Sequence, residues 1–138
     1  MDIELSSMFV IFGGTGDLTK RKLIPAIFSL MHEGKLSENF TIVSIGRQEK
    51  TSEQYREEMH EYVKEFSRFP LNNKLWDNFI KRIFYKNFDF TSNNQGYKDL
   101  DLFLEIMDNE YSTRGNRLYY LAVAPEFFEG IIRNFKKQ

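Results

Sequence analysis

Hydrophobic positions along this chain fall into two repeating patterns. Short runs of consecutive apolar residues predict strands covered on both faces, at residues 8–12, 40–45, 83–90 and 118–123. Between and after these runs, apolar residues recur every three or four positions, which predicts helices near residues 18–31, 55–66, 75–80, 97–107 and 125–135. Such alternation predicts an α/β fold, a doubly wound, Rossmann-like parallel sheet of about four strands in the order 3-2-1-4. We expect this sheet to be incomplete and residues 1–138 to form one domain of a larger protein.

The ends of several helices carry recognisable signals. Thr51 followed by Gln54 predicts an N-terminal capping box, and Gly34 stands where a helix commonly ends in a left-handed glycine. Pro125 is placed to open the last helix. Pro25 leaves two alternatives, because a proline inside a helix either kinks it or marks the start of a second segment after a first turn at residues 17–22.

Composition and charge argue against several classes of binding partner and site. With a net charge of -1, the 138 residues create no broad field that would attract nucleic acid or an anionic membrane. No apolar run approaches the length of a membrane span, and the acidic start of the chain does not suit a secretory signal. The chain has no cysteine, and His32 and His60 lack the spacing of metal ligands. We therefore expect a cytoplasmic protein without a metal site.

Candidate chemistry is concentrated where the first strand meets the first helix. The segment Gly13-Gly14-Thr15-Gly16-Asp17-Leu18 would let a pyrophosphate approach the backbone, and the start of a helix favours an anion. The alternative is a plain tight turn, because Leu18 stands where the common G-x-G-x-x-G pattern has its last glycine. The flanking strand and helix favour the nucleotide site.

Two groups of cations refine this hypothesis. Lys20, Arg21 and Lys22 lie near the positive end of the helix dipole, which indicates an anion nearby or a solvated basic turn. Arg47 follows the second strand, where an NAD-preferring fold usually carries an acidic residue, and a cation there would accommodate the 2′-phosphate of NADP. Arg47 therefore favours NADP, with NAD still possible. The alternative is an exposed arginine paired with Glu49.

Three segments resemble one enzyme family. Residues 13–26 resemble the G-x-x-G-D-L-x-x-R-K-L-x-P-A signature of glucose-6-phosphate dehydrogenases. Gly46-Arg47-Gln48 resembles that family's turn for the NADP phosphate. Residues 115–125 resemble its G-N-R-x-x-Y-L-A-x-x-P strand, which leads to the nicotinamide region. The similarity covers nearly the whole chain and is poorest between residues 51 and 82.

The resemblance implies roles for individual residues. Gly13 to Leu18 would wrap the pyrophosphate, Arg47 would contact the 2′-phosphate, and Lys22 would reach the sugar phosphate substrate. Phe128 falls where the family often has an aromatic residue beside the cofactor, although core packing explains it equally well. The implied cofactor-binding residues are Gly13, Gly14, Thr15, Gly16, Asp17, Leu18, Arg47, Asp89, Phe90, Ala122, Ala124 and Pro125.

The resemblance also implies a reaction and an oligomeric protein. A histidine base takes the proton of the C1 hydroxyl of glucose 6-phosphate while hydride passes to NADP, giving the lactone, and the full enzyme is expected to be a homo-oligomer. That histidine belongs to an R-I-D-H-Y-L-G-K motif, which these 138 residues lack, as they lack the family's E-K-P-F-G segment. We therefore assign no catalytic residue here and expect these residues alone to be inactive. His32 and His60 are interpreted as solvated helix residues.

Two alternatives stay open at this point. The Gly13-Gly14-Thr15-Gly16 run also suits extended short-chain dehydrogenases or sugar epimerases, although Thr19 replaces their last glycine and no Tyr-x-x-x-Lys pair follows. A nucleotide-binding module without chemistry of its own is the other alternative.

Overall fold

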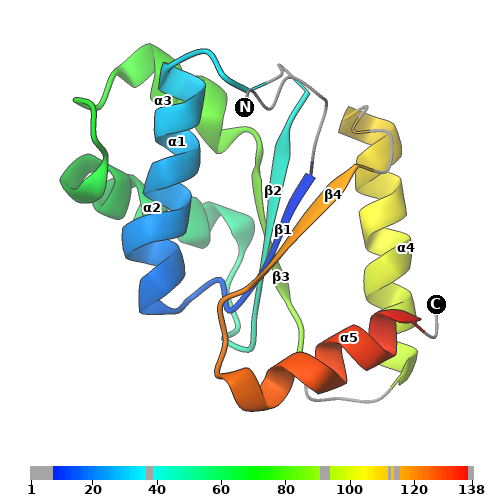
Figure 1. The fold of residues 1–138 in the computed structure, drawn as a ribbon. Coiled ribbons are helices and arrows are strands. Elements are labelled where there is room, and N and C mark those ends of the chain that lie inside the picture. Colours follow the sequence, from blue (N-terminus) through cyan, green and yellow to red (C-terminus); the bar gives the residue numbers. More distant parts are fainter. Residues whose placement is uncertain (1–7, 37–38, 91–93, 112, 114–115, 137–138) are drawn as a thin grey trace.

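Four parallel strands form the centre of the protein. The structure is a computed structural model that describes residues 8–36, 39–90, 94–111, 113 and 116–136. Its strands are β1 (Met8–Phe12), β2 (Thr41–Gly46), β3 (Ile83–Asn87) and β4 (Arg117–Leu121), in the order β3-β2-β1-β4. All three pairings are parallel, so the strands end at the same edge of the sheet, the lower one in Figure 1. The predicted fold and strand order are confirmed.

Helices cover both faces of this sheet. The helices α1 (Ile24–His32), α2 (Ser52–Phe66) and α3 (Asn73–Ile80) lie on one face, and α4 (Asn94–Tyr111) and α5 (Phe128–Lys136) on the other (Figure 1). Successive residues of β1 point to opposite sides, with Phe9 and Ile11 in the core under α1 to α3 and Val10 and Phe12 in the core under α4 and α5. Every residue of β1 and β2 is buried, as the continuous apolar runs predicted.

Three strands differ from the predicted ranges, because each strand is limited by its partners. β2 was expected at residues 40–45 and runs from Thr41 to Gly46. β3 was expected to reach Phe90 but ends at Asn87, which is level with Gly46, the last residue of β2. β4 was expected at residues 118–123 but begins one residue earlier and ends two residues earlier, at Leu121, which is level with Phe12, where β1 gives way to the glycine turn. Residues 88–90 and 122–124 are therefore loop residues at the carboxyl edge of the sheet.

Pro25 is accommodated by a wide helical turn. The helix continues from Asp17 through a π-helical segment, η1 (Thr19–Leu23), into α1, and the Ile24 amide bonds the carbonyl of Thr19, five residues earlier. Pro25 follows as the second residue of α1, directly after the wide turn, which makes room for the proline ring in the helix. The second alternative is confirmed, because a first turn passes over to a new segment near Pro25.

The predicted helix caps are also present. Thr51 and Gln54 form both hydrogen bonds of a capping box at the start of α2. Gly34 follows α1 with a φ of 72°, and its amide bonds the carbonyl of Met31. Pro125 opens a short 3-10 helix, η2 (Pro125–Phe127), that leads into α5.

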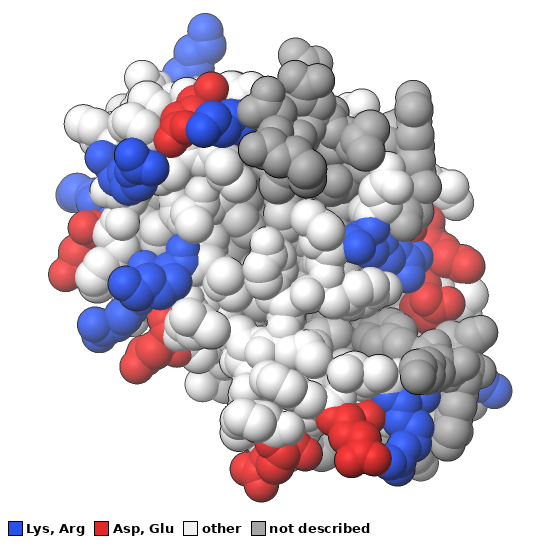
Figure 2. Space-filling model, viewed as in Figure 1, with Lys and Arg blue, Asp and Glu red and all other residues white. Residues whose placement is uncertain are grey.

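The prediction that β4 is buried is wrong. β4 pairs with β1 alone, so it is an edge strand, and the side chains of Leu118 and Tyr119 are 40% and 44% exposed. Figure 2 shows a largely uncharged surface over the middle of this view, which β4 crosses. The expected apolar stripe of the last helix is likewise split, because Ile131 is buried while Ile132 is 48% exposed.

None of the helices in the described ranges has the length and apolar character needed to cross a membrane.

Candidate functional site

A cavity of about 420 Å³ lies at the carboxyl edge of the sheet. It is formed by the turn after β1, the turn after β2, and the loops after β3 and β4. This edge is where ligands bind in open α/β sheets, at the point where the strand order reverses. The lining residues are Gly13, Thr15, Gly16, Gly46, Arg47, Gln48, Phe90, Val123, Ala124 and Phe127.

The glycine turn is fixed by its own backbone. Gly13 has a φ of 92°, and a Cβ atom there would lie 2.1 Å from the carbonyl oxygen of Ala122. The amides of Gly13 and Gly14 both donate to the carbonyl of Ile45 at 2.9 Å, and the Gly16 amide donates to the carbonyl of Gly13 at 3.0 Å. The amides of Thr15 and Asp17 take no part in those bonds, which leaves them as donors for an anion at the start of the helix.

Gly14 lies behind the wall of the cavity. It is buried, and a Cβ atom there would lie 2.7 Å from the Cβ atom of Ser44. Gly46 lines the cavity but is also crowded from behind, because a Cβ atom there would lie 2.6 Å from the hydroxyl oxygen of Tyr85. Close packing of the turns on the sheet is thus one reason for glycine at both positions.

Arg47 is exposed at the wall of the cavity, where it lies against two aromatic rings. Its guanidinium carbon lies 5.2 Å from the ring centroid of Phe90 and 5.8 Å from that of Phe127. These two rings pack edge to face at 5.4 Å. A guanidinium at this distance is attracted by the ring faces, which limits where the side chain can point. Glu49 forms no ion pair with Arg47 among the described residues.

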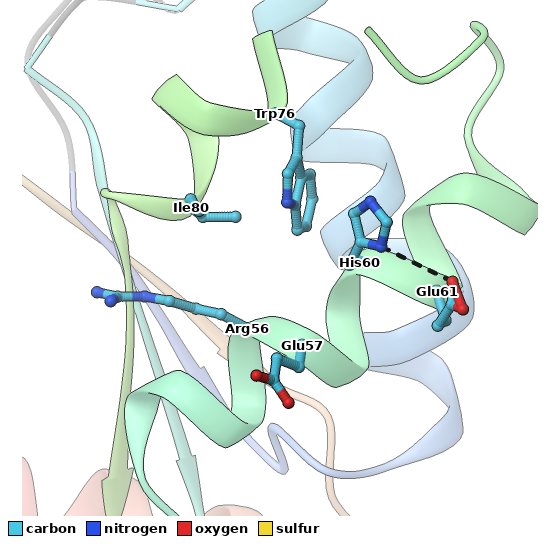
Figure 3. Close-up of a pocket in the computed structure, with 6 residues that line it drawn as sticks. All are labelled: Arg56, Glu57, His60, Glu61, Trp76 and Ile80. Atoms are coloured by element: carbon cyan, nitrogen blue, oxygen red, sulfur yellow. Dashed lines mark ion pairs between the residues drawn. The ribbon is translucent and has the colours of Figure 1, made fainter. Parts of the chain in front are cut away.

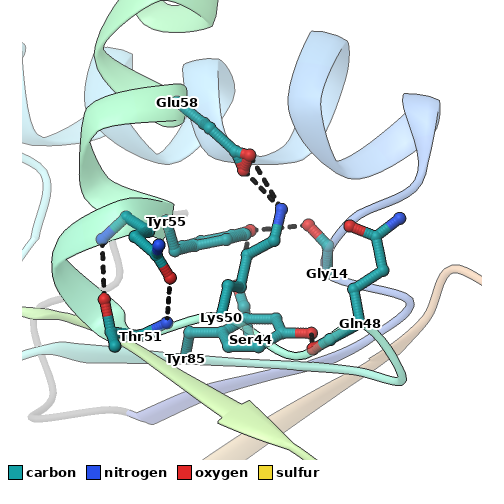
Figure 4. A network of polar contacts seen from close by, with 9 residues as sticks. Gly14, Ser44, Gln48, Lys50, Thr51, Tyr55, Glu58 and Tyr85 are labelled. Atoms are coloured by element: carbon teal, nitrogen blue, oxygen red, sulfur yellow. Dashed lines mark hydrogen bonds and ion pairs between the residues drawn. The ribbon is translucent and has the colours of Figure 1, made fainter.

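The turn after β2 is joined to α2 by polar contacts. Lys50 donates to both carboxylate oxygens of Glu58, with a distance of 2.7 Å to Oε2, and the capping box of Thr51 follows directly (Figure 4). The chain that carries Arg47 and Gln48 therefore runs from a buried strand straight into an anchored helix. This limits the positions that the turn can adopt.

Only part of the predicted site surrounds the cavity. Gly13, Thr15, Gly16, Arg47, Phe90 and Ala124 line it. Asp17 and Leu18 are exposed in the first helical turn, and Lys22 is exposed in η1. Asp89 is exposed in the loop after β3, and Pro125 is exposed at the start of η2. Ala122 packs against the core under α1 to α3, and its carbonyl oxygen limits the space at Gly13. The predicted site residues that do not line the cavity are Gly14, Asp17, Leu18, Lys22, Asp89, Ala122 and Pro125.

The basic turn is partly accounted for by packing. The ammonium of Lys20 lies 5.3 Å from the ring centroid of Tyr62, and the guanidinium carbon of Arg21 lies 5.4 Å from that of Phe66. Both rings belong to α2. Lys22 makes no such contact within the described residues, so it is the cation of this turn that has no structural explanation.

Four lining residues were not assigned individually to the cofactor. Gly46 and Gln48 belong to the turn that resembles the family's turn for the NADP phosphate, and both line the cavity beside Arg47. Val123 lies in the loop after β4, within the segment that resembles the family's strand toward the nicotinamide. Phe127 occupies the place expected for Phe128, because the short 3-10 helix before α5 turns Phe127 toward Phe90 while Phe128 is half-buried elsewhere.

Another cavity, of about 360 Å³, lies between α2 and α3 (Figure 3). Its lining includes the rings of His60 and Trp76, whose centroids are 5.0 Å apart, and His60 Nδ1 is 3.7 Å from Glu61 Oε2. It has no glycine turn and no strand end.

His32, the other histidine, lies outside this cavity and stacks on Phe69, with ring centroids 4.1 Å apart. No group of three or more possible metal ligands occurs among the described residues.

The fold and the cavity define a class of protein. A parallel sheet in the order β3-β2-β1-β4, with a tight glycine turn and an arginine at the carboxyl edge, is a dinucleotide-binding α/β domain. A family model described as the NAD-binding domain of glucose-6-phosphate dehydrogenase matches residues 10–138. The chain belongs to this family, which confirms the resemblance noted in the sequence.

Individual relatives agree with this assignment. The chain is 48% identical over 130 residues to the glucose-6-phosphate 1-dehydrogenase of Chlamydia pneumoniae, an alignment that covers 94% of this chain and 25% of that protein. It is 36% identical over 132 residues to the enzyme of Bacillus subtilis, covering 96% of this chain and 26% of that protein. A solved glucose-6-phosphate dehydrogenase in complex with glucose-6-phosphate superposes with a TM-score of 0.83 and 28% identity, over 99% of this chain and 28% of that chain. The chain thus spans about a quarter of the length of these relatives.

Proposed function

We propose that the cavity binds NADP and that the chain is the NADP-binding portion of an enzyme that oxidises glucose 6-phosphate to its lactone by hydride transfer to that cofactor, with residues 1–138 inactive by themselves. One observation carries the choice of NADP. Arg47 is the one charged side chain among the described residues that line the cavity, and no carboxylate lies there to hold the ribose hydroxyls of NAD. The substrate is inferred from the named relatives, because the chain covers only a quarter of their length.

The residues present fit a bound dinucleotide. A Cβ atom at Gly16 would make only ordinary contacts with the protein, 3.4 Å from the carbonyl oxygen of Gly13, but it would lie at the cavity wall, where glycine leaves that space to a pyrophosphate. We assign the pyrophosphate to Thr15 and the first helical turn, the 2′-phosphate to Arg47, and one wall of the cofactor site to Phe127. When bound, NADP supplies the nicotinamide ring that accepts the hydride.

The chain's own residues supply binding and orientation. Holding the cofactor at a fixed distance from the substrate converts an encounter of two molecules into a reaction within one complex. Lys22, exposed in η1, is proposed to contact the phosphate of the sugar. We assign no base to His32 or His60, because both rings pack against aromatic side chains away from the cavity.

The remaining assignments follow from the same function. We propose that residues 1–138 form one NADP-binding domain, that the protein acts as a homo-oligomer, and that it works in the cytoplasm. A chain of 138 residues without cysteine suits a reducing compartment.

Replacing Arg47 by alanine tests the choice of cofactor. The loss of a charge-assisted contact to the 2′-phosphate should weaken NADP binding by about 1.5–3 kcal/mol at most, less for an exposed pair, and leave NAD binding nearly unchanged. Isothermal titration of both cofactors measures this. Arg68→Ala is the matched control, because Arg68 is exposed and lies outside the cavity. Equal losses for NADP and NAD in Arg47→Ala would show that Arg47 has only a structural role.

A further inference from the structure

Three tyrosine hydroxyls hold the loops around the cavity from behind. The Tyr55 hydroxyl donates to the carbonyl of Gly14 at 2.7 Å, in the turn after β1. The Tyr85 hydroxyl donates to the carbonyl of Gln48 at 2.6 Å, in the turn after β2. The Tyr97 hydroxyl donates to the carbonyl of Phe90 at 2.6 Å, in the loop after β3. None of the three tyrosines lines the cavity.

These tyrosines are buried, and two of them act together. Tyr55 and Tyr97 are fully buried, and Tyr85 is 7% exposed. The rings of Tyr55 and Tyr85 stack with centroids 5.1 Å apart, so the contacts to Gly14 and Gln48 arise from one unit between α2 and β3 (Figure 4). Burial, more than the nearby Glu58, raises the pKa of Tyr85 to about 12. Burial, more than Asp89, raises the pKa of Tyr97 to about 12, so both hydroxyls can donate throughout the neutral range.

Each hydroxyl contacts a different part of the site. Gly14 belongs to the glycine turn, which every dinucleotide would use. Gln48 is the neighbour of Arg47, and the ring of Phe90 is one of the two that hold the Arg47 guanidinium. Displacement of the Gln48 or Phe90 backbone would move Arg47, whereas displacement of Gly14 would move the donors for the pyrophosphate.

We propose that Tyr55, Tyr85 and Tyr97 are positioning residues for the cofactor, with Tyr55 setting affinity for any dinucleotide and Tyr85 and Tyr97 setting the preference for NADP over NAD. This inference rests on the proposed function. It also explains glycine at position 46, because the Tyr85 hydroxyl passes over Gly46 on its way to Gln48 and leaves no room for a side chain.

Single Tyr→Phe variants test the proposal, because each keeps the ring and removes one donor. Isothermal titration should show that Tyr85→Phe and Tyr97→Phe bind NADP about three- to tenfold more weakly while NAD changes less than about twofold. Tyr55→Phe should weaken both cofactors by about the same three- to tenfold, leaving the preference unchanged. A merely structural role would lower thermal stability without changing the ratio of the two affinities in Tyr85→Phe and Tyr97→Phe, and without weakening the binding of either cofactor in Tyr55→Phe.

Two controls isolate the three hydrogen bonds. Tyr62→Phe changes a tyrosine of the same helix, α2, whose ring packs on Phe66 and whose hydroxyl forms no hydrogen bond within the described residues. Ser44→Ala removes the other partner of the Tyr55 hydroxyl, at 2.9 Å, and leaves the contact to Gly14 in place. Both should bind the two cofactors as the unchanged chain does.

A second variant covers the case in which Tyr85→Phe does not fold. Fluorinating the Tyr85 ring lowers the pKa of its phenol while keeping the native contacts at low pH. The preference for NADP should then fall as the pH rises through that pKa, because a phenolate cannot donate to Gln48, and the unmodified chain should show no such fall. If the preference for NADP over NAD is unchanged in the Tyr85 and Tyr97 variants, the inference is overturned, although the proposed binding of NADP is not. Failure of the unchanged chain to bind NADP would overturn the proposed function together with it.

Discussion

Gly13→Ala is expected to destabilise the fold by about 2–5 kcal/mol, combining the cost of a left-handed conformation with that of overpacking. The added methyl group would lie 2.1 Å from the carbonyl oxygen of Ala122. That segment cannot retreat easily, because the Ala122 amide bonds the carbonyl of Phe12 at 2.8 Å and so holds β4 to β1. Urea denaturation followed by circular dichroism measures the loss.

Gly34→Ala separates the two causes of that loss. Gly34 also has a left-handed backbone, with a φ of 72°, but apart from its immediate chain neighbours no part of the described ranges lies within 4 Å of the site for a Cβ atom. Its replacement should therefore cost only the conformational part, about 1–2 kcal/mol. Equal losses for Gly13→Ala and Gly34→Ala would contradict the close approach of the glycine turn to the loop after β4.

Arg117→Met is expected to destabilise the protein by about 3 kcal/mol, the lower end of the range for removing one partner of a buried ion pair. Arg117 donates from Nε and Nη2 to Asp108 at 3.0 and 2.8 Å, and the two side chains are 14% and 10% exposed. Although burial opposes the charged form, hydrogen bonds with Tyr119 and Asp108 raise the pKa of Arg117. Removing the arginine leaves the Asp108 carboxylate with Thr113 as its partner.

Two comparisons test whether the charge of Asp108 causes this loss. In the double variant Arg117→Met with Asp108→Asn, part of the stability should return, because a neutral amide can still accept from Thr113 without a buried charge. Arg133→Met removes an exposed partner of Glu129 and should cost less than about 0.5 kcal/mol. A double variant no more stable than Arg117→Met would argue against an uncompensated charge.

Local patterns in the sequence were enough to predict most of the fold. The capping box at Thr51 and the glycine at position 34 reflect interactions between neighbouring residues, and both are confirmed. The apolar runs of β1 and β2 reflect burial on both faces of the sheet, which a run of consecutive residues reveals, and they are confirmed as well. Strand ends could not be predicted in this way. The end of β3 at Asn87 depends on its pairing with Gly46, about 40 residues away in the chain.

The site was harder to predict because distant segments form it. Arg47 could be selected from its place after a strand, and it lines the cavity. The contact of Arg47 with Phe127 could not be predicted, because the ring of Phe127 comes from η2, which is far away in the chain. Gly115, at the start of the segment that resembles the family's strand, lies outside the described residues. Arg117 in the same segment forms an ion pair with Asp108. It lies at the opposite end of β4 from the cavity.

The most direct test is to locate the cofactor by recording ¹H–¹⁵N NMR spectra of the chain during titration with NADP. We expect the largest shifts at the amides of Thr15, Gly16, Arg47, Gln48 and Phe127, which surround the cavity at the carboxyl edge of the sheet. Titration with NAD should repeat the shifts at Thr15 and Gly16 but give smaller ones at Arg47 and Gln48, because NAD lacks the 2′-phosphate. Shifts concentrated instead around His60 and Trp76, in the cavity between α2 and α3, would contradict the proposed cofactor site.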